Sequence, residues 1–495
     1  MSDSLKSKVV SGVFWLTATK AIGQAITWLI TIAVVRLLSP ADYGLMGIAT
    51  LFIGLLLLFN ELGLGAAVVQ KADLNTDHLS DLRWAILLIN VALCLLLVLG
   101  APMVARYFNE PSLTSIIRAL AVIFVIQGVG SPSACMLQRG MQFKTKSRAE
   151  LIGNVTGSMT TLAFAFAGFR VWSLVAGYLA LQLTTHGLYC FHHPIPFRRR
   201  FSPSNVRPFL NFGFHMTSSR VLWYISSNAD SVVVGRMLGA VQLGYYGLAF
   251  QLSTMPTDKI MSIVTQVAYP SFCALQNDDA TLKRYFLKLI SVVSLITFPM
   301  FLGFFIIAER GIPLLLTSRW APVIVPLQIL CSVSCLRAIG SLNTPMLMAK
   351  GRTRLILFNF TLQAILLPLG FYIGARYGLV GVSVAWLVLG PLLFGVMTAQ
   401  TLQVVGLTVG DYAAALRHAA FGSVVMVGFV TLVQRALLEH MPASYHVALT
   451  VVMGVALYGA YQAVMNRGAF VEMRSVLKRP AAARVERQAA EASVA

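Results

Sequence analysis

Charged residues are scarce in this sequence. Asp, Glu, Lys and Arg make up only 11% of its 495 residues, whereas hydrophobic residues make up 57% and the mean hydropathy is +0.76. Soluble domains carry roughly one quarter charged residues. A composition so poor in charge excludes an ordinary soluble enzyme or binding domain, and it predicts a membrane protein.

Cysteine is scarce too, and the few cysteines are badly placed for disulfides. All six lie within apolar runs or at their ends, which argues against a disulfide framework in an oxidising loop. Cys331 and Cys335 share a helix face, but no histidine or acidic residue stands beside them. We interpret this pair as packing residues. We expect no metal site and no bound cofactor.

Long apolar runs are what the sequence has in abundance. Each is about 18 or more residues long, enough to cross a hydrocarbon core of about 30 Å, and continuous runs predict helices rather than barrel strands. We therefore predict an all-α, polytopic membrane protein, its first run retained as a helix and not cleaved. The fourteen predicted transmembrane helices span residues 9–35, 43–69, 84–105, 113–137, 151–168, 171–191, 209–235, 243–272, 287–308, 321–349, 355–374, 379–405, 419–438 and 443–464.

The positive charge is distributed by side of the membrane. The net charge is +20, and if the N-terminus is cytoplasmic, 25 of the 38 Lys and Arg fall in cytoplasmic segments, counting Lys288 at the cytoplasmic start of its span, and eight fall in the opposite loops. Cytoplasmic loops of membrane proteins carry an excess of Lys and Arg. The asymmetry predicts that both termini are cytoplasmic, and it explains the excess charge without a nucleic-acid partner.

The chain contains an internal repeat. The segments RLLSPADYGLMGIA, which begins at Arg36, and RMLGAVQLGYYGLA, which begins at Arg236, are identical at five positions with an offset of 200 residues and no gap. The same offset relates two polar stripes at helical spacing. These stripes are Thr17, Lys20, Gln24, Thr27 and Thr31, and then Thr217, Arg220, Tyr224, Ser227 and Ser231.

The repeat predicts the domain organisation. Six helices per half is an even number, so both halves enter from one side and their pseudo-twofold axis runs along the membrane normal. We predict an N-terminal lobe over residues 1–192, a basic cytoplasmic linker over 193–208 and a C-terminal lobe over 209–405. Two extra helices follow over 406–466, and a basic cytoplasmic tail over 467–495.

Ionisable residues inside the spans are the candidates for a binding site. A charge at the bilayer centre costs at least about 2.5 to 3.5 kcal/mol, so such residues face a partner or a watery cavity. We expect Lys20, Arg220 and Arg337 to bind an anionic head group in a central cleft. Alternatively, Lys20 pairs with Glu61 and Arg220 with Asp230 to neutralise charge. The expected polar lining of the cleft is Thr17, Gln24, Thr27, Asn60, Thr217, Tyr224, Ser227 and Asn228.

Three carboxylates are candidates for ion coupling, should a proton or sodium gradient drive transport. They are Glu61, Asp230 and Asp258. A structural role is open for two of them. Asp230 suits an arginine partner near the outer end of its helix, and Asp258 is neutralised by its neighbour Lys259.

Two segments resemble a known family. LLSPADYGLMGIATLFIGLLLLFNELGLGAAVVQ (residues 37–70) and NADSVVVGRMLGAVQLGYYGLAFQLSTMPTDKIMSIVTQVAYPSF (residues 228–272) resemble polysaccharide transporters of the multidrug/oligosaccharidyl-lipid/polysaccharide superfamily. Within it the sequence looks like the Wzx-like flippases of the colanic-acid and xanthan exporter type. The resemblance covers nearly the whole chain.

The resemblance implies both an architecture and a function. Twelve helices form two lobes around a cationic cleft, with two helices added, and Lys20 and Arg220 match the cations thought to bind pyrophosphate. The implied substrate is an undecaprenyl-pyrophosphate-linked oligosaccharide. It crosses the inner, cytoplasmic membrane of a bacterium by alternating access, for exopolysaccharide, capsule or O-antigen (lipopolysaccharide) assembly. Membrane lipid and the polysaccharide polymerase machinery are the implied partners.

Three alternatives stand beside this reading. A drug/cation antiporter of the same superfamily would favour acidic cavity residues, against Lys20 and Arg220. A lipid II flippase would share the phosphate chemistry and stays open. A membrane glycosyltransferase or polymerase is disfavoured because every predicted outer loop is short. The longest, residues 309–320, leaves little room for catalytic carboxylates or arginines, so we expect no enzyme.

Overall fold

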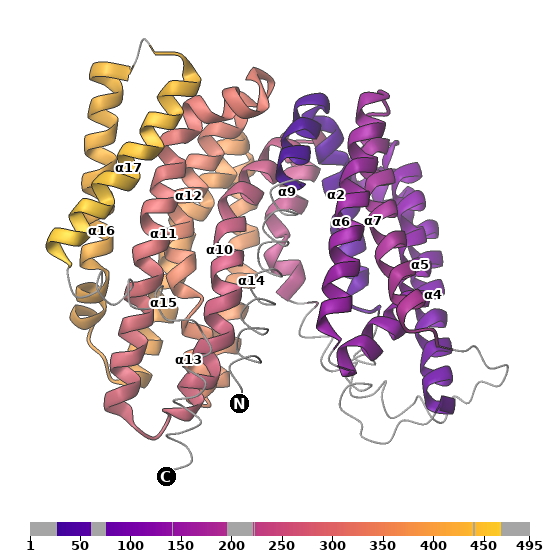
Figure 1. Cartoon of the computed structure of the whole chain (residues 1–495), viewed down its shortest axis with the longest axis horizontal. Helices are drawn as coiled ribbons and strands as arrows, with labels where there is room; N and C mark the ends of the chain where they lie inside the picture. Colours follow the sequence, from indigo (N-terminus) through magenta and orange to yellow (C-terminus); the bar gives the residue numbers. More distant parts are fainter. Residues whose placement is uncertain are drawn as a thin grey trace, which may run out of the picture. The chain divides into compact units, whose positions relative to one another are not determined.

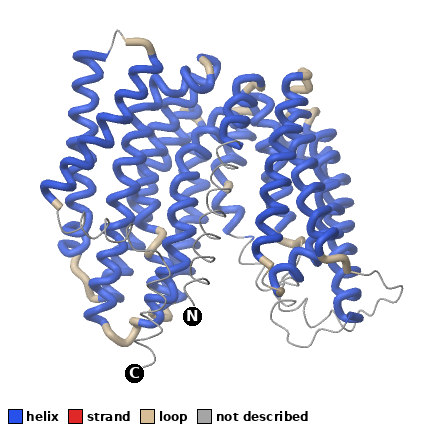
Figure 2. The backbone as a smooth tube through the Cα atoms, viewed as in Figure 1, coloured by secondary structure: helices blue, strands red, loops and turns tan. Residues whose placement is uncertain are grey.

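The structure, a computed structural model, describes residues 27–60, 76–140, 142–195, 221, 223–438 and 441–466. All regular secondary structure in these ranges is helical (Figure 2). Each of the fourteen predicted spans overlaps a described helix, and nine helices of this part are long and apolar enough to cross a membrane. The prediction of an all-α, polytopic membrane protein is thus confirmed, while α6, α7 and α10 are long but more polar.

The chain divides into two compact units. Unit 1 comprises Met1–Leu248, Leu315–Trp320 and Ala364–Val382, and unit 2 comprises Ala249–Leu314, Ala321–Gln363 and Ser383–Ala495. The predicted limits of the two lobes and of the extra helices stay predictions. The predicted tail and most of the predicted linker lie outside the described residues.

Unit 1 is built around α5. Three fully buried side chains of this helix, Ile117, Leu120 and Phe124, form an apolar face against its neighbours, which include α4 and α7. Figure 1 shows these helices running alongside one another in its purple part. The helices of unit 1 include a short helix over Thr27–Leu37, α2 (Pro40–Leu57), α4 (Thr76–Phe108), α5 (Leu113–Arg139), α6 (Phe143–Phe166), α7 (Val171–His192), α9 (Ala229–Met237) and the first turns of α10 (Ala240–Ala274).

Small residues bring α6 and α7 close together. A Cβ added at Gly157 would lie 2.8 Å from the carbonyl oxygen of Gly177, and one at Gly177 would lie 2.8 Å from that of Gly157. Such contacts let helix backbones approach in a lipid environment, where packing rather than water exclusion drives association. The backbones of the two helices are therefore in close contact within unit 1.

α2 begins with a complete N-terminal capping box and ends before the predicted residue. Ser39 caps it, with Pro40 in the first turn and a reciprocal capping box to Asp42. The apolar run predicts a helix as far as Val69, but the helix ends at Leu57 and a turn and a bend follow as far as Asn60. Apolar periodicity alone carries no signal for that end, because the side chains on both sides of it are hydrophobic.

Unit 2 holds most of α10 and the later helices. The buried residues Phe286, Ile290 and Phe301 form the inner face of α11, and Tyr458 of α17 donates a 3.0 Å hydrogen bond to the carbonyl of Leu295. The helices are α11 (Asp279–Leu316), the 3₁₀ turn η2 (Ser318–Val323), α12 (Ile324–Gly340), α13 (Asn343–Ala349), α14 (Thr353–Ala375), α15 (Gly378–Val405), α16 (Val409–Val433), the π turn η3 (Gln434–Leu438) and α17 (Ala443–Met465). The end of α11, the first half of η2 as far as Trp320, the end of α14 and the start of α15 belong to unit 1.

The turn before α11 is polar and well bonded. Asp278 accepts the backbone N–H of Thr281 at 3.0 Å as a helix cap, and hydrogen bonds from Thr281 hold the pKa of the Asp278 carboxyl below its usual value. Lys350 donates to Asp279 at 2.7 Å and to the carbonyl of Gln276 at 2.9 Å. The start of α11 is thereby fixed to the end of α13.

Candidate functional site

Eight of the fourteen predicted site residues fall in the described part of the chain. The other six lie outside the described residues, and the pairing of Lys20 with Arg220 stays a prediction. These six are Thr17, Lys20, Gln24, Glu61, Thr217 and Arg220.

Arg337 of α12 lies between two aromatic rings. Its guanidinium carbon is 4.9 Å from the centroid of the Trp386 ring on α15 and 5.2 Å from that of the Phe250 ring on α10. All three residues are half-buried members of unit 2. Cation–π contacts are worth about 0.5 to 2 kcal/mol according to how far they are desolvated.

The aromatic contacts suit an anion-binding role for Arg337. A guanidinium is planar, permanently charged and able to donate two parallel hydrogen bonds to a phosphate. The contacts with Trp386 and Phe250 position this group within unit 2. Tight packing of α12 against α15, where a Cβ at Gly390 would lie 2.9 Å from Val333, holds this cluster in place.

Tyr224, on the predicted helix 7, lies against α2. Tyr224 donates a 2.9 Å hydrogen bond to the carbonyl of Leu51, and Gly54 makes room for its ring. Asn228 bonds back to the carbonyl of Tyr224 at 2.8 Å. Tyr224 and Asn228 therefore have structural contacts within unit 1, and their role in lining a cleft stays a prediction. Ser227 and Thr27 are half-buried in unit 1.

The two described carboxylates differ in surroundings. Asp230 is buried, and it accepts hydrogen bonds of 2.7 Å from the Tyr246 hydroxyl and from the backbone N–H of Ser231. Asp258 is exposed on α10, as is its neighbour Lys259. Neither arrangement decides between ion coupling and a structural role, so both assignments stay predictions.

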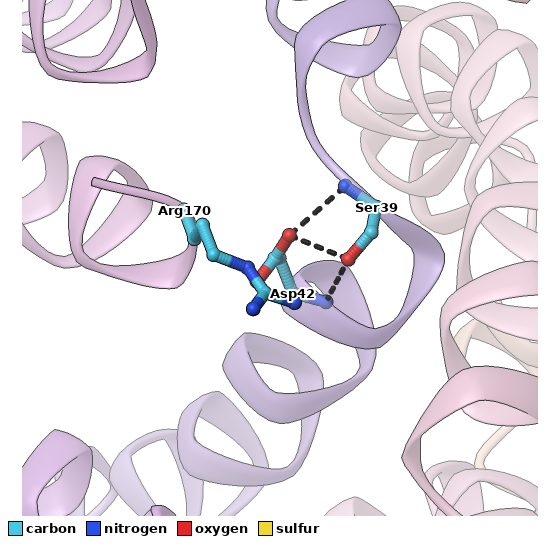
Figure 3. A network of polar contacts seen from close by, with 3 residues as sticks. All are labelled: Ser39, Asp42 and Arg170. Atoms are coloured by element: carbon cyan, nitrogen blue, oxygen red, sulfur yellow. Dashed lines mark hydrogen bonds and ion pairs between the residues drawn. The ribbon is translucent and has the colours of Figure 1, made fainter. Parts of the chain in front are cut away.

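The start of α2 forms a polar junction with the loop before α7. Asp42 is buried and accepts the backbone N–H of Ser39 at 2.9 Å, while its own N–H donates to the Ser39 hydroxyl at 3.3 Å. The Nε of Arg170 lies 3.7 Å from the second carboxylate oxygen (Figure 3). Arg170 adopts a φ of +51°, which is unusual for a residue with a side chain. This end of α2 is predicted to be the outer end.

The two copies of the repeat meet at this end of unit 1. A Cβ at Gly44 of α2 would collide with the carbonyl of Ala240, and one at Gly244 of α10 would collide with the carbonyl of Pro40. Gly44 and Gly244, like Pro40 and Ala240, are 200 residues apart. The contact is therefore reciprocal, as a pseudo-twofold axis requires.

Trp320 of η2 packs into the same junction. It is fully buried, and its indole N–H donates a 3.0 Å hydrogen bond to the carbonyl of Val35. The rings of Tyr43 on α2 and Tyr245 on α10 contact it edge-on, with centroids 5.5 and 5.9 Å away. One aromatic side chain thus contacts both copies of the repeat.

A cluster of buried amides was missed by the sequence analysis. Asn60, three residues after the end of α2, is buried and donates a 2.6 Å hydrogen bond to Gln127 of α5, and its role in lining a cleft stays a prediction. Asn90 of α4 in turn donates to the backbone carbonyl of Asn60 at 3.1 Å. The signal was available, since Asn90 and Gln127 are polar residues in the middle of apolar runs.

Similarity to known proteins agrees with this architecture. The fold of the solved lipid II flippase MurJ in an inward closed conformation matches with a TM-score of 0.72, covering 91% of this chain and 99% of that one at 14% identity. The chain therefore shares the all-helical, multi-pass fold of this solved protein.

The family is defined by sequence. The family described as "polysaccharide biosynthesis protein" matches residues 33–325. The chain belongs to this family. It is 27% identical to the lipopolysaccharide biosynthesis protein WzxC of Escherichia coli strain K12 over 389 residues, which is 78% of this chain and 79% of that protein. It is 26% identical to the succinoglycan biosynthesis transport protein ExoT of Rhizobium meliloti strain 1021 over 329 residues, 65% of each chain.

Proposed function

We propose that this protein is a flippase for an undecaprenyl-pyrophosphate-linked oligosaccharide repeat unit. It acts in the bacterial inner membrane and serves the assembly of exopolysaccharide, capsule or O-antigen. Membership of the polysaccharide biosynthesis protein family carries the proposal. The relative ExoT, named as a transport protein, supports transport. Translocation breaks no covalent bond, so the chain acts as a transporter and not as an enzyme.

The proposed mechanism is alternating access. The sugar and pyrophosphate enter a cleft from the cytoplasm, while the prenyl tail stays in the lipid. Lys20, Arg220 and Arg337 bind the phosphates, and Arg337, which contacts Trp386 and Phe250, supports this assignment because it keeps its charge at any cellular pH. A proton or sodium gradient supplies the driving force. The polymerase machinery receives the product.

Two rivals have the same architecture. A lipid II flippase would bind a polyprenyl pyrophosphate with a different sugar and peptide, and the similarity to MurJ concerns the fold alone. A drug/cation antiporter would have to bind a cationic substrate near Arg337, which like charge disfavours. Comparing translocation of the proposed lipid with that of lipid II separates the proposal from the first rival.

A vesicle assay tests the proposal. The purified full-length protein is reconstituted with a fluorescent polyprenyl-pyrophosphate oligosaccharide, and translocation is read from the label that becomes accessible to an impermeant quencher on the opposite side. We expect translocation of this lipid to exceed that of lipid II, and to fall in the Lys20→Ala and Arg220→Ala variants. Normal translocation by the double variant would remove the proposed phosphate site. Preferential translocation of lipid II would replace the substrate.

The predicted orientation has its own test. An alkaline-phosphatase fusion placed after His192, at the end of α7, should be inactive, because the predicted linker is cytoplasmic. A fluorescent-protein fusion at the same position should be bright. An active phosphatase there would reverse the predicted topology, and with it the direction from which substrate enters.

A further inference from the structure

The buried amides of unit 1 form a cluster in the membrane-spanning region. Asn60, Asn90 and Gln127 are 8%, 0% and 8% exposed. Their three helices bring them to similar depth: Asn60 lies 20 residues after the start of α2, Gln127 lies 14 after the start of α5, and Asn90 lies 18 before the end of α4. At 1.5 Å per residue these offsets are about 20 to 30 Å from one end of unit 1.

Two side-chain oxygens of the cluster accept no hydrogen bond in the described structure. The Nδ2 of Asn60 bonds Gln127 Oε1 at 2.6 Å, and the Nδ2 of Asn90 bonds the carbonyls of Ile86 at 2.7 Å and Asn60 at 3.1 Å. The Oδ1 atoms of Asn60 and Asn90 are buried and have no hydrogen-bond partner in the described structure. Leaving a buried acceptor unsatisfied costs about 1 to 3 kcal/mol, so native proteins rarely do so.

Asn90 packs against a glycine of the neighbouring helix. A Cβ added at Gly128 of α5 would lie 2.9 Å from the Cβ of Asn90. Glycine at this position therefore gives Asn90 its place between α4 and α5. An apolar residue at position 90 would fill the same space without an orphaned oxygen, so packing alone does not explain the asparagine.

The electrostatics of the cluster favour a positive charge. Asn60 follows the C-terminal end of α2, where the helix dipole places a partial negative charge of about half an elementary unit. In transporters, helices that end within the membrane present such ends to sodium ions or protons. Amide and backbone carbonyl oxygens are hard ligands suited to hard cations.

We propose that Asn60, Asn90 and Gln127 form a binding site for a monovalent alkali-metal cation. The Oδ1 atoms of Asn60 and Asn90 are its ligands, and Gln127 orients Asn60. A single charge fits because three neutral amides do not offset two charges in a low-dielectric interior. The site uses none of the carboxylates considered for ion coupling. That its cation drives translocation rests on the proposed function, whereas binding itself does not.

Thermal unfolding of the purified full-length protein in detergent tests the site. The midpoint is measured in NaCl, KCl and choline chloride at equal ionic strength. A ligand that binds only the folded state raises stability with its concentration. We expect a saturable rise in one alkali chloride and none in choline chloride, and we expect Asn90→Leu to abolish it. The identity of the effective salt distinguishes sodium from potassium.

Asn359→Leu is the matched control. Asn359 is also a buried helical asparagine, bonded to Gln400 at 2.6 Å and to the carbonyl of Leu355 at 2.8 Å, but in unit 2. This variant should keep the salt-specific rise. If Asn90→Leu does not fold, Gln127→Leu takes its place, and equilibrium binding of ²²Na⁺ or ⁸⁶Rb⁺ to the wild-type protein needs no variant.

The outcomes are decisive for the site and separate from the flippase assay. Identical midpoints in all three salts, with no binding of either isotope, would overturn the proposal and assign the two oxygens to water. An equal salt response in Asn90→Leu and Asn359→Leu would overturn it as well. Translocation of lipid-linked oligosaccharide without any cation binding would sink only this inference, and cation binding without translocation would sink only the proposed function.

Discussion

Gly44 of α2 lies directly against the backbone carbonyl of Ala240, the residue that begins α10. The equivalent residues of the other repeat copy, Gly244 and Pro40, make the same contact in the opposite sense. The repeat found by comparing Arg36 with Arg236 is therefore expressed in the structure as a close crossing of two helices.

The crossing predicts that its two glycines do not tolerate a methyl group. Gly44→Ala and Gly244→Ala should each lower stability by about 1 to 3 kcal/mol, the usual cost of overpacking, because the neighbouring atom is rigid backbone. Gly47→Ala and Gly247→Ala are matched controls. Their added Cβ would meet only a side chain at 3.7 Å or nothing within 4 Å.

The control variants should be neutral or up to about 1 kcal/mol more stable, since alanine is the better helix former. Thermal unfolding followed by size-exclusion chromatography measures all four variants. If Gly44→Ala and Gly47→Ala have the same midpoint, the two backbones are not in contact.

Substitution of Trp320 should reveal how much one buried hydrogen bond contributes to stability. Trp320→Phe keeps an aromatic ring between Tyr43 and Tyr245 but leaves the carbonyl of Val35 without its donor. Stability should fall by about 1 to 3 kcal/mol, the cost of an unsatisfied buried acceptor. Trp172→Phe, at a 41% exposed position, should change the thermal midpoint little. Equal midpoints for the two variants would contradict the indole bond.

Substitutions of the two charged residues in Figure 3 should change the stability of the protein in opposite directions. Asp42→Asn should destabilise by about 1 kcal/mol, because the carboxylate completes a capping box while buried. Arg170→Gly should stabilise. Its side chain is 74% exposed, so the ion pair is worth little, whereas a φ of +51° at a residue with a side chain costs of order 1 to 3 kcal/mol.

Chemical or thermal unfolding of the two variants checks these signs. Asp411→Asn serves as the control for Asp42→Asn, because Asp411 completes the same capping box with Thr408 at an exposed helix start. It should cost less. A destabilised Arg170→Gly would show that the contact with Asp42 outweighs the backbone conformation.

Arg337 predicts a graded loss of transport. Arg337→Met should lower the rate of translocation by roughly 10- to 100-fold, because a hydrogen bond to a charged group is worth about 1.5 to 3 kcal/mol. The translocation rate of Arg337→Lys should lie between those of the wild-type protein and Arg337→Met, since lysine keeps the charge but loses the planar, bidentate geometry. The vesicle assay measures the rates at matched protein amounts, and Arg352→Met, at an exposed position before α14, is the control. Normal rates in Arg337→Met would exclude this residue from the site.

Much of the fold is legible in the sequence because a bilayer imposes length and composition on each helix. The positions of the spans and the repeat could be predicted, and Arg337 stood out as a cation in an apolar run. The end of α2 at Leu57 could not be predicted, because the residues on either side of it are equally apolar. Helix ends inside a bundle are set by the partners that accept their backbone groups.

The contacts of the site were harder to foresee. Asn60 donates a hydrogen bond to Gln127, which lies 67 positions away in the sequence, and no local pattern connects the two residues. The aromatic rings around Arg337 come from α10 and α15, which no local pattern connects. Sequence periodicity reports which face of a helix is polar, whereas the identity of the opposing side chain depends on how distant segments pack.

The reciprocal glycine crossing bears on how such a chain could arise. When residue i of one segment contacts residue j of another, and j contacts i in return, the surface is self-complementary. A half-length ancestor carrying a single copy of the motif would already possess both sides of the contact and could pair with itself. Fusion of two such genes would then link an existing homodimer, and each copy would afterwards be free to acquire its own polar side chains.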